Sequence, residues 1–449
     1  MSATLSQVWR STVQSNPDAI AVINTADGQV WTRSRLSGLV KTWCDRVPNA
    51  ASIAGKRVAM SVPNGLDWWG AFLGLQELGA VPVLIDASEP TTRQIEIASG
   101  ARAVALWSRG EWIVTSKART RVETDACLVK LTSGSTGKPK AWQFTHAQML
   151  ADGRQVCSSM GIKPGDLNLA AIPLGHSYGL GNLVVPLIEQ GTGMVLVDSP
   201  LPNILAAAAA RWNTTVFPAV PTLLDALVRS AAEPEKLKSV RLVISAGASL
   251  SPVLAVGFAK KFGKSVHNFY GTSETGGICY DRTGAATQTG RSVGTPLDGV
   301  VLKWRNGRRF FVESRAVVGR GLFSPLDFGQ HNDWGELVLV GRSGRVVKVG
   351  ARRVDLGEIE AALKSIPGVG DAFAAVSGDG HQAIAVAVAT ILPKSTVRAA
   401  LLEKLPTWKL PHKIVTMMAL PVTLRGKLDK QAVESLLSSR IVDQSGKTD

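Results

Sequence analysis

The chain has 449 residues, of which 45% are hydrophobic and 19% charged, so it is long enough for two or three domains and has an ordinary globular composition. Its net charge of +15 is spread along the sequence without a basic tail or an arginine-rich block. We therefore do not expect a dedicated nucleic-acid binder, because such a diffuse positive field favours small anionic ligands or acidic partners. A basic surface without any specific partner stays open as the alternative.

The N-terminus, the apolar runs and the cysteines exclude further classes. MSATLSQVWRSTVQSNPDAI has no apolar core behind basic residues, and no apolar run reaches the roughly 18–20 residues that span a bilayer. The cysteines lie far apart without CxxC spacing, which argues against a zinc site or a disulfide framework: Cys44, Cys127, Cys157 and Cys279. This usage fits a reducing compartment, and we expect a cytoplasmic protein with no membrane span.

Segments rich in Val, Ile and Leu alternate with amphipathic segments through most of the chain. A strand, a helix and a second strand are predicted in two places, at residues 57–63, 68–78 and 80–86, and at residues 214–220, 221–231 and 240–247. Strand–helix–strand units of this length imply parallel sheets covered by helices. The predicted fold class is therefore α/β, with a large N-terminal domain of parallel-rich sheets and packed helices.

The pattern changes near Gly341–Arg342. SGRVVKVGARRV (343–354) is a short, basic β pattern punctuated by glycine. Asp355 and Glu358 then have the spacing of a capping box, and the helix that they begin should stop before Pro367.

A second domain follows from this change. Residues 383–390 (AIAVAVAT) read as a further strand, so the last part of the chain combines strands and helices. We predict an N-terminal domain of residues 1–342 and a small, mobile α+β domain of residues 343–449. Ser343–Gly344 is the predicted hinge, since glycine absorbs large backbone changes.

A loop of small and hydroxylated residues occupies positions 131–141, LTSGSTGKPKA. It is not a Walker A loop, which needs four residues between its glycines and Ser or Thr after its lysine. Backbone N–H groups, hydroxyls and lysines can nevertheless donate to a phosphate; a plain polar turn is the alternative. The candidate phosphate ligands are Thr132, Ser133, Gly134, Ser135, Thr136, Gly137, Lys138 and Lys140.

Four later segments complete an ordered set of five motifs: NFYGTSETGG (268–277), SPLDFGQHNDWGELVLVGR (324–342), KVGARRVDLGEIE (348–360) and PVTLRGKLDK (421–430). With these motifs the chain closely resembles the adenylate-forming enzymes, which include acyl-CoA synthetases, aryl-CoA ligases, luciferases and the adenylation domains of peptide synthetases. The resemblance extends upstream through RVAMSVPN (57–64) and LGLQELGAVPVLID (73–86), so it covers nearly the whole chain. It implies ATP as substrate and Mg²⁺ as cofactor.

The resemblance assigns nucleotide contacts to the second motif. Tyr270 would pack on adenine, Ser273 would touch the α-phosphate in place of the family's usual threonine, and Glu274 would bind Mg²⁺. It also implies contacts for Gly247, Ala248 and Ser249 of SAGAS (245–249), and for Gly271 and Thr272.

In the third motif, the resemblance makes Asp327 the ribose-binding carboxylate and Arg342 its reinforcing partner. The usual Thr-Gly before that aspartate is Pro325–Leu326 here, and Asp333 is a nearby alternative. In the last motif, Lys427 matches the catalytic lysine, which reaches the substrate carboxylate and the α-phosphate and stabilises the developing charge. A lone lysine near a C-terminus would otherwise be solvated surface.

The acid-binding segment is AAIPLGHSYGLGNLVVPL (170–187). Peptide-synthetase domains carry an aspartate here that pairs with an amino group, whereas this segment looks like that of acyl- and aryl-CoA ligases. His176 matches a residue at the wall between the nucleotide and acid pockets, and we count it as catalytic; a satisfied loop histidine is the alternative. Because a buried ammonium without an acidic partner is costly, a fatty or aromatic carboxylic acid is favoured. There is no Ser-His-Asp triad, since Ser249 lacks a GxSxG setting.

The resemblance implies adenylation with release of pyrophosphate, then transfer to the thiol of coenzyme A or of a phosphopantetheine arm on an acidic acyl carrier protein. Two departures concern the second step: Gly344 stands at the usual hinge Asp or Lys, and Ala351 replaces a glycine two residues before Arg353. An added methyl group could hinder a thiol in a narrow tunnel. Two alternatives stay open: a non-thiol acceptor, by amide formation or intramolecular capture, and a nucleotide-binding homologue without turnover.

Overall fold

The structure, a computed structural model, describes residues 3–48, 50–115, 122, 125–132, 139–248, 250–305, 309–342, 346–349, 352–377, 383–421 and 429–438. The chain divides into two compact units. The larger unit comprises residues 1–87, 94–132 and 140–343, and the smaller one residues 88–93, 133–139 and 344–449. The predicted hinge lies outside the described residues, so the boundary between residues 342 and 343 stays a prediction.

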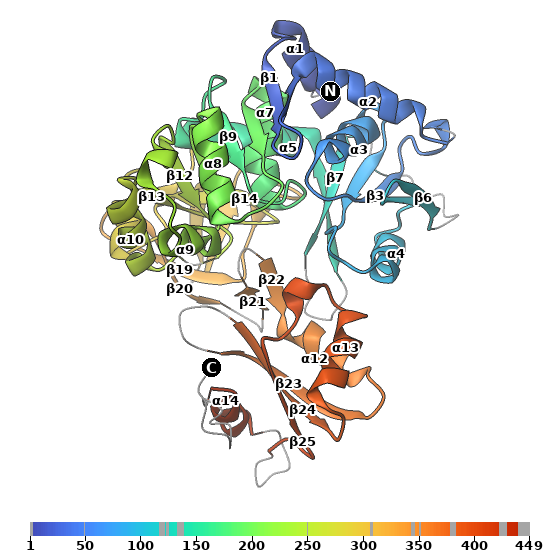
Figure 1. The fold of residues 1–449 in the computed structure, drawn as a ribbon, viewed down its shortest axis with the longest axis vertical. Coiled ribbons are helices and arrows are strands. Elements are labelled where there is room, and N and C mark those ends of the chain that lie inside the picture. The colour runs from blue at the N-terminus through green and yellow to red at the C-terminus, as the bar shows by residue number, and fades with distance from the viewer. Residues whose placement is uncertain are drawn as a thin grey trace. The chain divides into compact units, whose positions relative to one another are not determined.

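The largest sheet of the larger unit has nine strands in the order β15-β14-β13-β12-β11-β9-β10-β1-β2. Figure 1 labels β1, β9, β12, β13 and β14 of this sheet. Its strands are β1 (Ile20–Asn24), β2 (Gln29–Thr32), β9 (Leu167–Ala170), β10 (Gly193–Leu196), β11 (Val216–Ala219), β12 (Leu242–Ser245), β13 (Val266–Thr272), β14 (Gly276–Tyr280) and β15 (Thr295–Pro296). The strands from β13 to β1 in this order run parallel to one another, whereas the pairs β13–β14, β14–β15 and β1–β2 are antiparallel.

Helices cover both faces of this sheet. On one face, α8 (Pro202–Trp212), α9 (Pro221–Arg229) and α10 (Pro252–Phe262) bury their apolar residues in a single core with the strands. On the other face, Val156 and Met160 of α5 (His146–Met160) share a core with Ile244 of β12. Burial on both faces explains why these short strands are almost wholly apolar.

A second sheet has six strands in the order β6-β5-β3-β4-β7-β8. They are β3 (Arg57–Ser61), β4 (Val81–Leu84), β5 (Ala105–Ser108), β6 (Glu111–Val114), β7 (Ala126–Thr132) and β8 (Lys140–Thr145), and only β6 and β8 are antiparallel. Its helices are α1 (Leu5–Ser15), α2 (Arg33–Asp45), α3 (Leu66–Glu77) and α4 (Thr91–Gly100). Trp43 of α2 packs so closely on Gly74 of α3 that a Cβ there would lie 2.2 Å from its ring.

A third, smaller sheet belongs to the same unit and consists of β16 (Val301–Arg305), β17 (Arg309–Glu313), β18 (Leu322–Phe323), β19 (Asp327–His331) and β20 (Leu337–Arg342). Phe310, Val312 and Leu337 join it to the core around Ile244. Short helical segments complete the unit: η1 (Ala50–Ser52), α6 (Ser177–Gly179), the π-helix η2 (Leu180–Val184), α7 (Val185–Gln190), η3 (Pro234–Leu237) and α11 (Ala285–Thr289).

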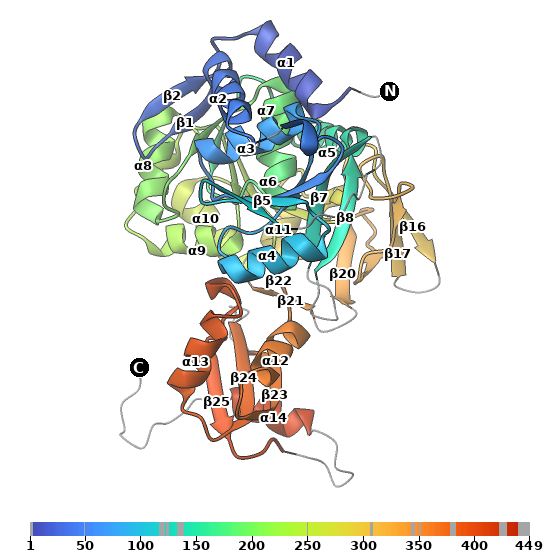
Figure 2. The same ribbon diagram turned by 90° about the vertical axis from the view of Figure 1, so that its right-hand side faces the viewer.

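The smaller unit is α+β, as Figure 2 shows. Its elements are the paired β21 (Val346–Val349) and β22 (Arg352–Asp355), the sheet of β23 (Val369–Ser377), β24 (Ala383–Thr390) and β25 (Lys413–Met417), and the helices α12 (Leu356–Lys364), α13 (Lys394–Leu402), η4 (Thr407–Lys409) and α14 (Lys430–Ser438). Side chains alternate along β23 and β24: one face packs on α12 and α13, the other on α14.

The predicted fold class is confirmed, and its details are corrected in two places. The predicted strands and helices lie at β3, α3, β4, β11, α9 and β12, but the sheets are mixed at their edges. The predicted capping box is replaced by a simpler cap: the Asp355 carboxylate accepts from the N–H of Gly357, whereas Glu358 pairs with Lys409 at 2.9 Å.

The structure also bears on the cysteines and on membrane insertion. All four cysteines are free thiols. Within the described residues, no helix has the length and apolar character needed to cross a membrane.

Candidate active site

Some of the predicted site residues of the larger unit lie at or after the carboxyl ends of parallel strands, where open α/β sheets bind ligands. Tyr270 is near the end of β13, and Gly247 follows β12. His176 lies in the segment after β9. The strands therefore bring together residues that are widely separated in the sequence.

Tyr270 and Asp327 form a buried hydrogen bond. The Tyr270 hydroxyl donates to Oδ2 of Asp327 at 2.8 Å, and the two residues are 4% and 8% exposed. Asp327 begins β19 and lies opposite Arg342 of β20 in the strand register; the Arg342 side chain is outside the described part. Asp333 is exposed in the β19–β20 turn, so the alternative carboxylate is not beside Tyr270.

The turn after Tyr270 is tightly folded on itself. A Cβ at Gly271 would lie 2.5 Å from the carbonyl oxygen of Gly276, so only glycine fits there. The hydroxyls of Thr272 and Thr275 are 3.0 Å apart, and the Val318 N–H donates to the Glu274 carbonyl at 2.9 Å. Glu274 is 9% exposed. The turn thus has a fixed shape before any ligand binds.

A buried aspartate and a buried lysine lie behind this turn, and the sequence analysis missed both. Asp152 of α5 accepts from the Gly277 N–H at 2.9 Å. Burial raises the pKa of its carboxyl, against the effect of Lys130. Burial lowers the pKa of the Lys130 amine, opposed by the charges of Asp152 and Glu274. An ionisable side chain in an otherwise apolar strand such as 126–132 is the signal that could have found Lys130.

The residues present fit an Mg²⁺ ion that is held jointly with a nucleotide. Mg²⁺ usually takes one or two protein carboxylates plus phosphate oxygens and waters. Glu274 is such a carboxylate, and the described residues contain no group of three metal-ligating side chains that would make a separate metal cage.

His176 lies beside Asp86, which follows β4. Its Nε2 is 3.2 Å from Oδ2 of Asp86, and the two side chains are 44% and 13% exposed. Asn64, after β3, donates to the Ile172 carbonyl and accepts from the Leu174 N–H, each at 2.9 Å. The histidine turn is thus in contact with two strand ends of the six-stranded sheet.

Tyr178, two residues after His176, points into the protein. Its hydroxyl donates to the Ile244 carbonyl at 3.1 Å, its ring packs on Phe269, and burial raises the pKa of the phenol well above its usual value. Within the predicted acid-binding segment, Tyr178 therefore contributes an uncharged, apolar ring.

Several predicted residues lie outside the described part of the chain. They are Ser133, Gly134, Ser135, Thr136, Gly137 and Lys138 of the phosphate loop, Ser249, the hinge residue Gly344, Ala351 and Lys427. The ends of the phosphate loop are described: Thr132 of β7 pairs with Lys140 of β8, and its hydroxyl accepts from Trp142 Nε1 at 3.0 Å. Gly247, with φ of +88°, and Ala248 follow β12.

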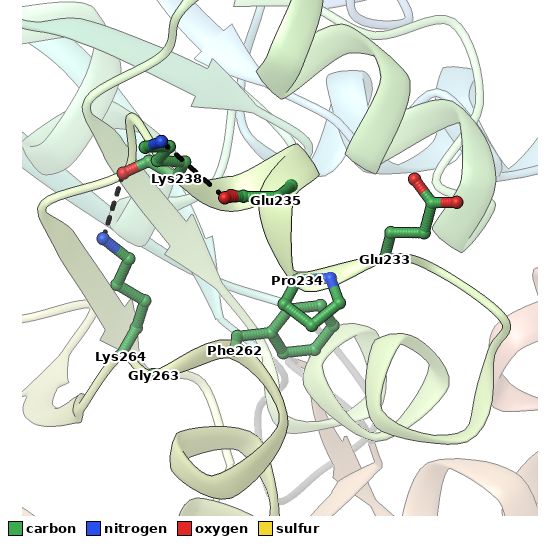
Figure 3. A pocket seen from close by; sticks show the side chains of 7 residues that line it. All are labelled: Glu233, Pro234, Glu235, Lys238, Phe262, Gly263 and Lys264. Atoms are coloured by element: carbon green, nitrogen blue, oxygen red, sulfur yellow. Dashed lines mark hydrogen bonds and ion pairs between the residues drawn. The ribbon is translucent and has the colours of Figure 1, made fainter.

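A surface depression of about 600 Å³ lies elsewhere on the larger unit, and Figure 3 shows its lining: Glu233, Pro234, Glu235, Lys238, Phe262, Gly263 and Lys264. Lys264 Nζ donates to the Lys238 carbonyl at 3.0 Å. No predicted site residue lines this depression, so we do not count it as part of the site.

Known proteins match this chain along most of its length. The family model described as "AMP-binding enzyme" matches residues 101–310. Phenyloxazoline synthase MbtB of Mycobacterium sp. (strain MCS) is 28% identical over 97% of this chain and 42% of its own length. The L-proline–[L-prolyl-carrier protein] ligase of Streptomyces coelicolor is 28% identical over 68% of this chain and 65% of its own. The chain thus spans less than two thirds of either relative.

Solved structures share the fold. The o-succinylbenzoate CoA synthetase MenE from Bacillus subtilis superposes with a TM-score of 0.82 at 20% identity, covering 95% of this chain and 98% of that one. The amide bond synthetase McbA from Marinactinospora thermotolerans gives 0.82 at 21% identity, covering 97% and 100%.

These matches confirm the resemblance read from the sequence motifs. The fold and the matched segment are those of an AMP-binding enzyme. Residues 101–310 thus match the AMP-binding enzyme family, and the relatives and structural neighbours of the chain are adenylate-forming enzymes.

Proposed function

We propose that the chain activates a fatty or aromatic carboxylic acid with ATP and then transfers the acyl group to the thiol of coenzyme A or of a carrier protein's pantetheine arm. The observation that carries this proposal is the buried hydrogen bond between Tyr270 and Asp327. The turn that follows Tyr270 is held by the bond from the Val318 N–H to the Glu274 carbonyl. By the resemblance, the aromatic ring would pack on adenine, one carboxylate would bind the ribose hydroxyls and the other would bind the metal of a bound ATP.

In the first step, a carboxylate oxygen of the acid attacks the α-phosphorus of ATP. The bond to the bridging oxygen of pyrophosphate breaks, and the products are the acyl-adenylate and pyrophosphate. Ser273 would donate to the α-phosphate, and Lys427 would offset the charge that develops there. Glu274 would hold Mg²⁺, which would supply further charge neutralisation on the phosphates.

In the second step, a thiolate attacks the acyl carbon, and the bond to AMP breaks. AMP is a much better leaving group than the oxide of a free carboxylate, so the first step prepares the second. The net charge of +15 suits an anionic coenzyme or an acidic carrier protein. We propose that residues 343–449 form the mobile domain that carries Lys427.

The choice of acid rests on the segment at 170–187. It contains no Asp or Glu, and Tyr178 contributes an apolar ring whose hydroxyl is already bonded to the backbone. A substrate ammonium in this segment would lose its hydration without gaining a charged partner. An apolar acyl or aryl group needs no such partner.

The test is pyrophosphate exchange on the purified protein with ATP, Mg²⁺ and a panel of fatty, aryl and amino acids. The active acids are then incubated with coenzyme A, and thioester is sought by mass. Exchange with a fatty or aryl acid, followed by thioester, supports the proposal. Exchange only with amino acids contradicts the proposed acid class, and exchange without thioester directs attention to Ala351 and to a non-thiol acceptor. No exchange with any acid would favour the homologue without turnover.

The variant Lys427→Ala examines the first step separately. We expect it to slow adenylation by about 10²–10³-fold, the usual effect of removing a charge-stabilising group, while thioester formation from a preformed adenylate is largely kept. Lys394→Ala is a matched control, because Lys394 is an exposed lysine of the same unit. Intact adenylation in Lys427→Ala would mean that the assigned role is wrong.

A further inference from the structure

The turn that carries His176 obtains part of its backbone hydrogen bonds from a distant residue. Within the turn, the His176 N–H donates to the Pro173 carbonyl at 3.4 Å, and the Leu180 N–H donates to the His176 carbonyl at 2.8 Å. Asn64 adds two contacts from outside the turn: its amide donates to the Ile172 carbonyl and accepts from the Leu174 N–H, each at 2.9 Å. Because Asn64 bonds two backbone groups that are two residues apart, it restrains both the position and the direction of the segment that follows β9.

The His176 ring has a restraint of its own. Oδ2 of Asp86 is 3.2 Å from Nε2, and the Asp86 side chain is largely buried while the imidazole is 44% exposed. A carboxylate accepts from a ring N–H, so this contact places the proton of the neutral ring on Nε2 and leaves Nδ1 with its lone pair. One edge of the ring is therefore occupied, and the rest remains accessible.

Asn64 and Asp86 occupy equivalent places in the fold. Asn64 follows β3 and Asp86 follows β4, and these strands are parallel neighbours in the six-stranded sheet. The turn itself follows β9 of the nine-stranded sheet. Two adjacent strand ends of one sheet thus determine where a residue from the other sheet stands.

We propose that Asn64 and Asp86 are positioning residues for His176: Asn64 fixes the backbone of its turn, and Asp86 fixes the orientation and tautomer of its ring. The catalytic consequence rests on the proposed function, in which His176 borders the acid and nucleotide pockets. A ring held at one edge presents a constant wall to the acid. Loss of the restraint should therefore weaken use of the acid more than use of ATP.

A double-mutant cycle tests the part of Asp86. Asp86→Ala, His176→Ala and the combination are compared by pyrophosphate exchange, with the acid that the wild-type protein uses best. We expect Asp86→Ala to lower kcat/KM for the acid by about tenfold, with KM for ATP nearly unchanged, and to cost nothing further when His176 is already alanine. Losses that multiply in the double variant would overturn the proposal, because Asp86 would then act independently of His176.

A second readout needs no turnover. The imidazole ¹⁵N chemical shifts of His176 are assigned by comparison with His176→Ala, and are measured for the neutral ring in the wild type and in Asp86→Ala. The Nε2–H tautomer should dominate in the wild type and lose population in the variant; unchanged shifts overturn the proposal. If His176→Ala leaves exchange intact, His176 has no role in the proposed adenylation. The ¹⁵N shifts still decide whether Asp86 positions the ring.

Asn64→Ala tests the backbone restraint. We expect a several-fold loss of kcat/KM for the acid in the wild-type background and none in the His176→Ala background, with an equal fall in Tm in both. A loss of activity that persists without His176 contradicts the positioning role. Asp298→Ala is the control for both residues, because Asp298 bonds to Ser158 and Arg282 on the surface of the same unit and should leave exchange unchanged.

Discussion

The two turns that carry the predicted site residues are stabilised in different ways. The turn at 172–179 depends on Asn64 and Asp86, which lie 90 to 110 residues away in the sequence. The turn at 270–277 also has bonds among its own residues, such as the hydroxyl pair of Thr272 and Thr275 and the antiparallel pairing of β13 with β14. Its contacts from elsewhere in the chain are Asp152 on α5, Val318 and Asp327.

This difference explains why one turn is easier to recognise than the other. A turn stabilised by its own residues must carry the required glycines and hydroxyls in a short string, and NFYGTSETGG is such a string. A turn stabilised from elsewhere can have almost any local sequence, provided that the distant partners are present. Of the four variants below, which run from the largest expected effect to the smallest, the first three test this contrast and the fourth examines a further turn.

Gly179→Ala should disrupt the remotely stabilised turn most. A Cβ at Gly179 would lie 2.0 Å from the Pro173 carbonyl oxygen, a backbone atom that cannot rotate away. We expect the free energy of unfolding to fall by about 3 kcal/mol, measured by urea denaturation. Gly175→Ala is the control in the same turn, since its nearest atom would be 3.6 Å away. Equal stability of the two variants would show that the turn is not closely packed.

Gly276→Ala makes the corresponding change in the locally stabilised turn. Gly276 has φ of +70°, and a Cβ there would lie 2.2 Å from Oδ1 of Asp152. We expect a loss of about 2–3 kcal/mol, from backbone strain and from the clash.

Asp152→Ala tells these two causes apart. Alone, it removes the acceptor of the Gly277 N–H and should cost about 1–3 kcal/mol. Combined with Gly276→Ala it also removes the clash, so the double variant should be more stable than the sum of the single losses predicts. Strict additivity would leave backbone strain as the whole effect of the Gly276 change.

Glu336→Gln probes the turn that joins β19, where Asp327 lies, to β20. Glu336 accepts from Arg291, Ser292 and Asn332, and the hydrogen bonds, that of Arg291 foremost, lower the pKa of its carboxyl from 4.5 to about 2. A carboxylate with a lowered pKa stabilises the fold above its ordinary pKa, and this stabilisation is lost as the pH falls toward 2.

We expect Glu336→Gln to cost about 1–2 kcal/mol at pH 7, and the difference from the wild type to narrow as the pH falls below 4.5. Thermal unfolding between pH 7 and pH 3 measures it. Glu313→Gln is the control, because its partner Lys303 is a surface lysine and exposed ion pairs contribute little. A difference in Tm that does not change with pH would mean that the charge of Glu336 is not involved.

Part of the fold could be predicted because its signals are local. Parallel strands buried on both faces are short apolar runs, so β3, β4, β11 and β12 were predictable from 57–63, 80–86, 214–220 and 240–247. The antiparallel edge strands lack this signal. The pairing of Glu358 with Lys409 was also unpredictable, since it depends on a residue 51 positions away.

The sequence by itself indicated the resemblance to adenylate-forming enzymes, the fold class and the identity of Tyr270, Glu274, Asp327 and His176 as candidate site residues, because motif residues keep their order along the chain. Only the tertiary structure decided which side chains support them. Asn64 and Asp86 follow predicted strands, so the rule that ligands bind at strand ends could have identified them as candidate site residues. That rule could not have predicted their contact with the His176 turn. Asp152 has no such signal. A hydrogen bond depends on distance in space, and a side chain on α5 becomes the neighbour of Gly277 only when the helix has packed on the sheet.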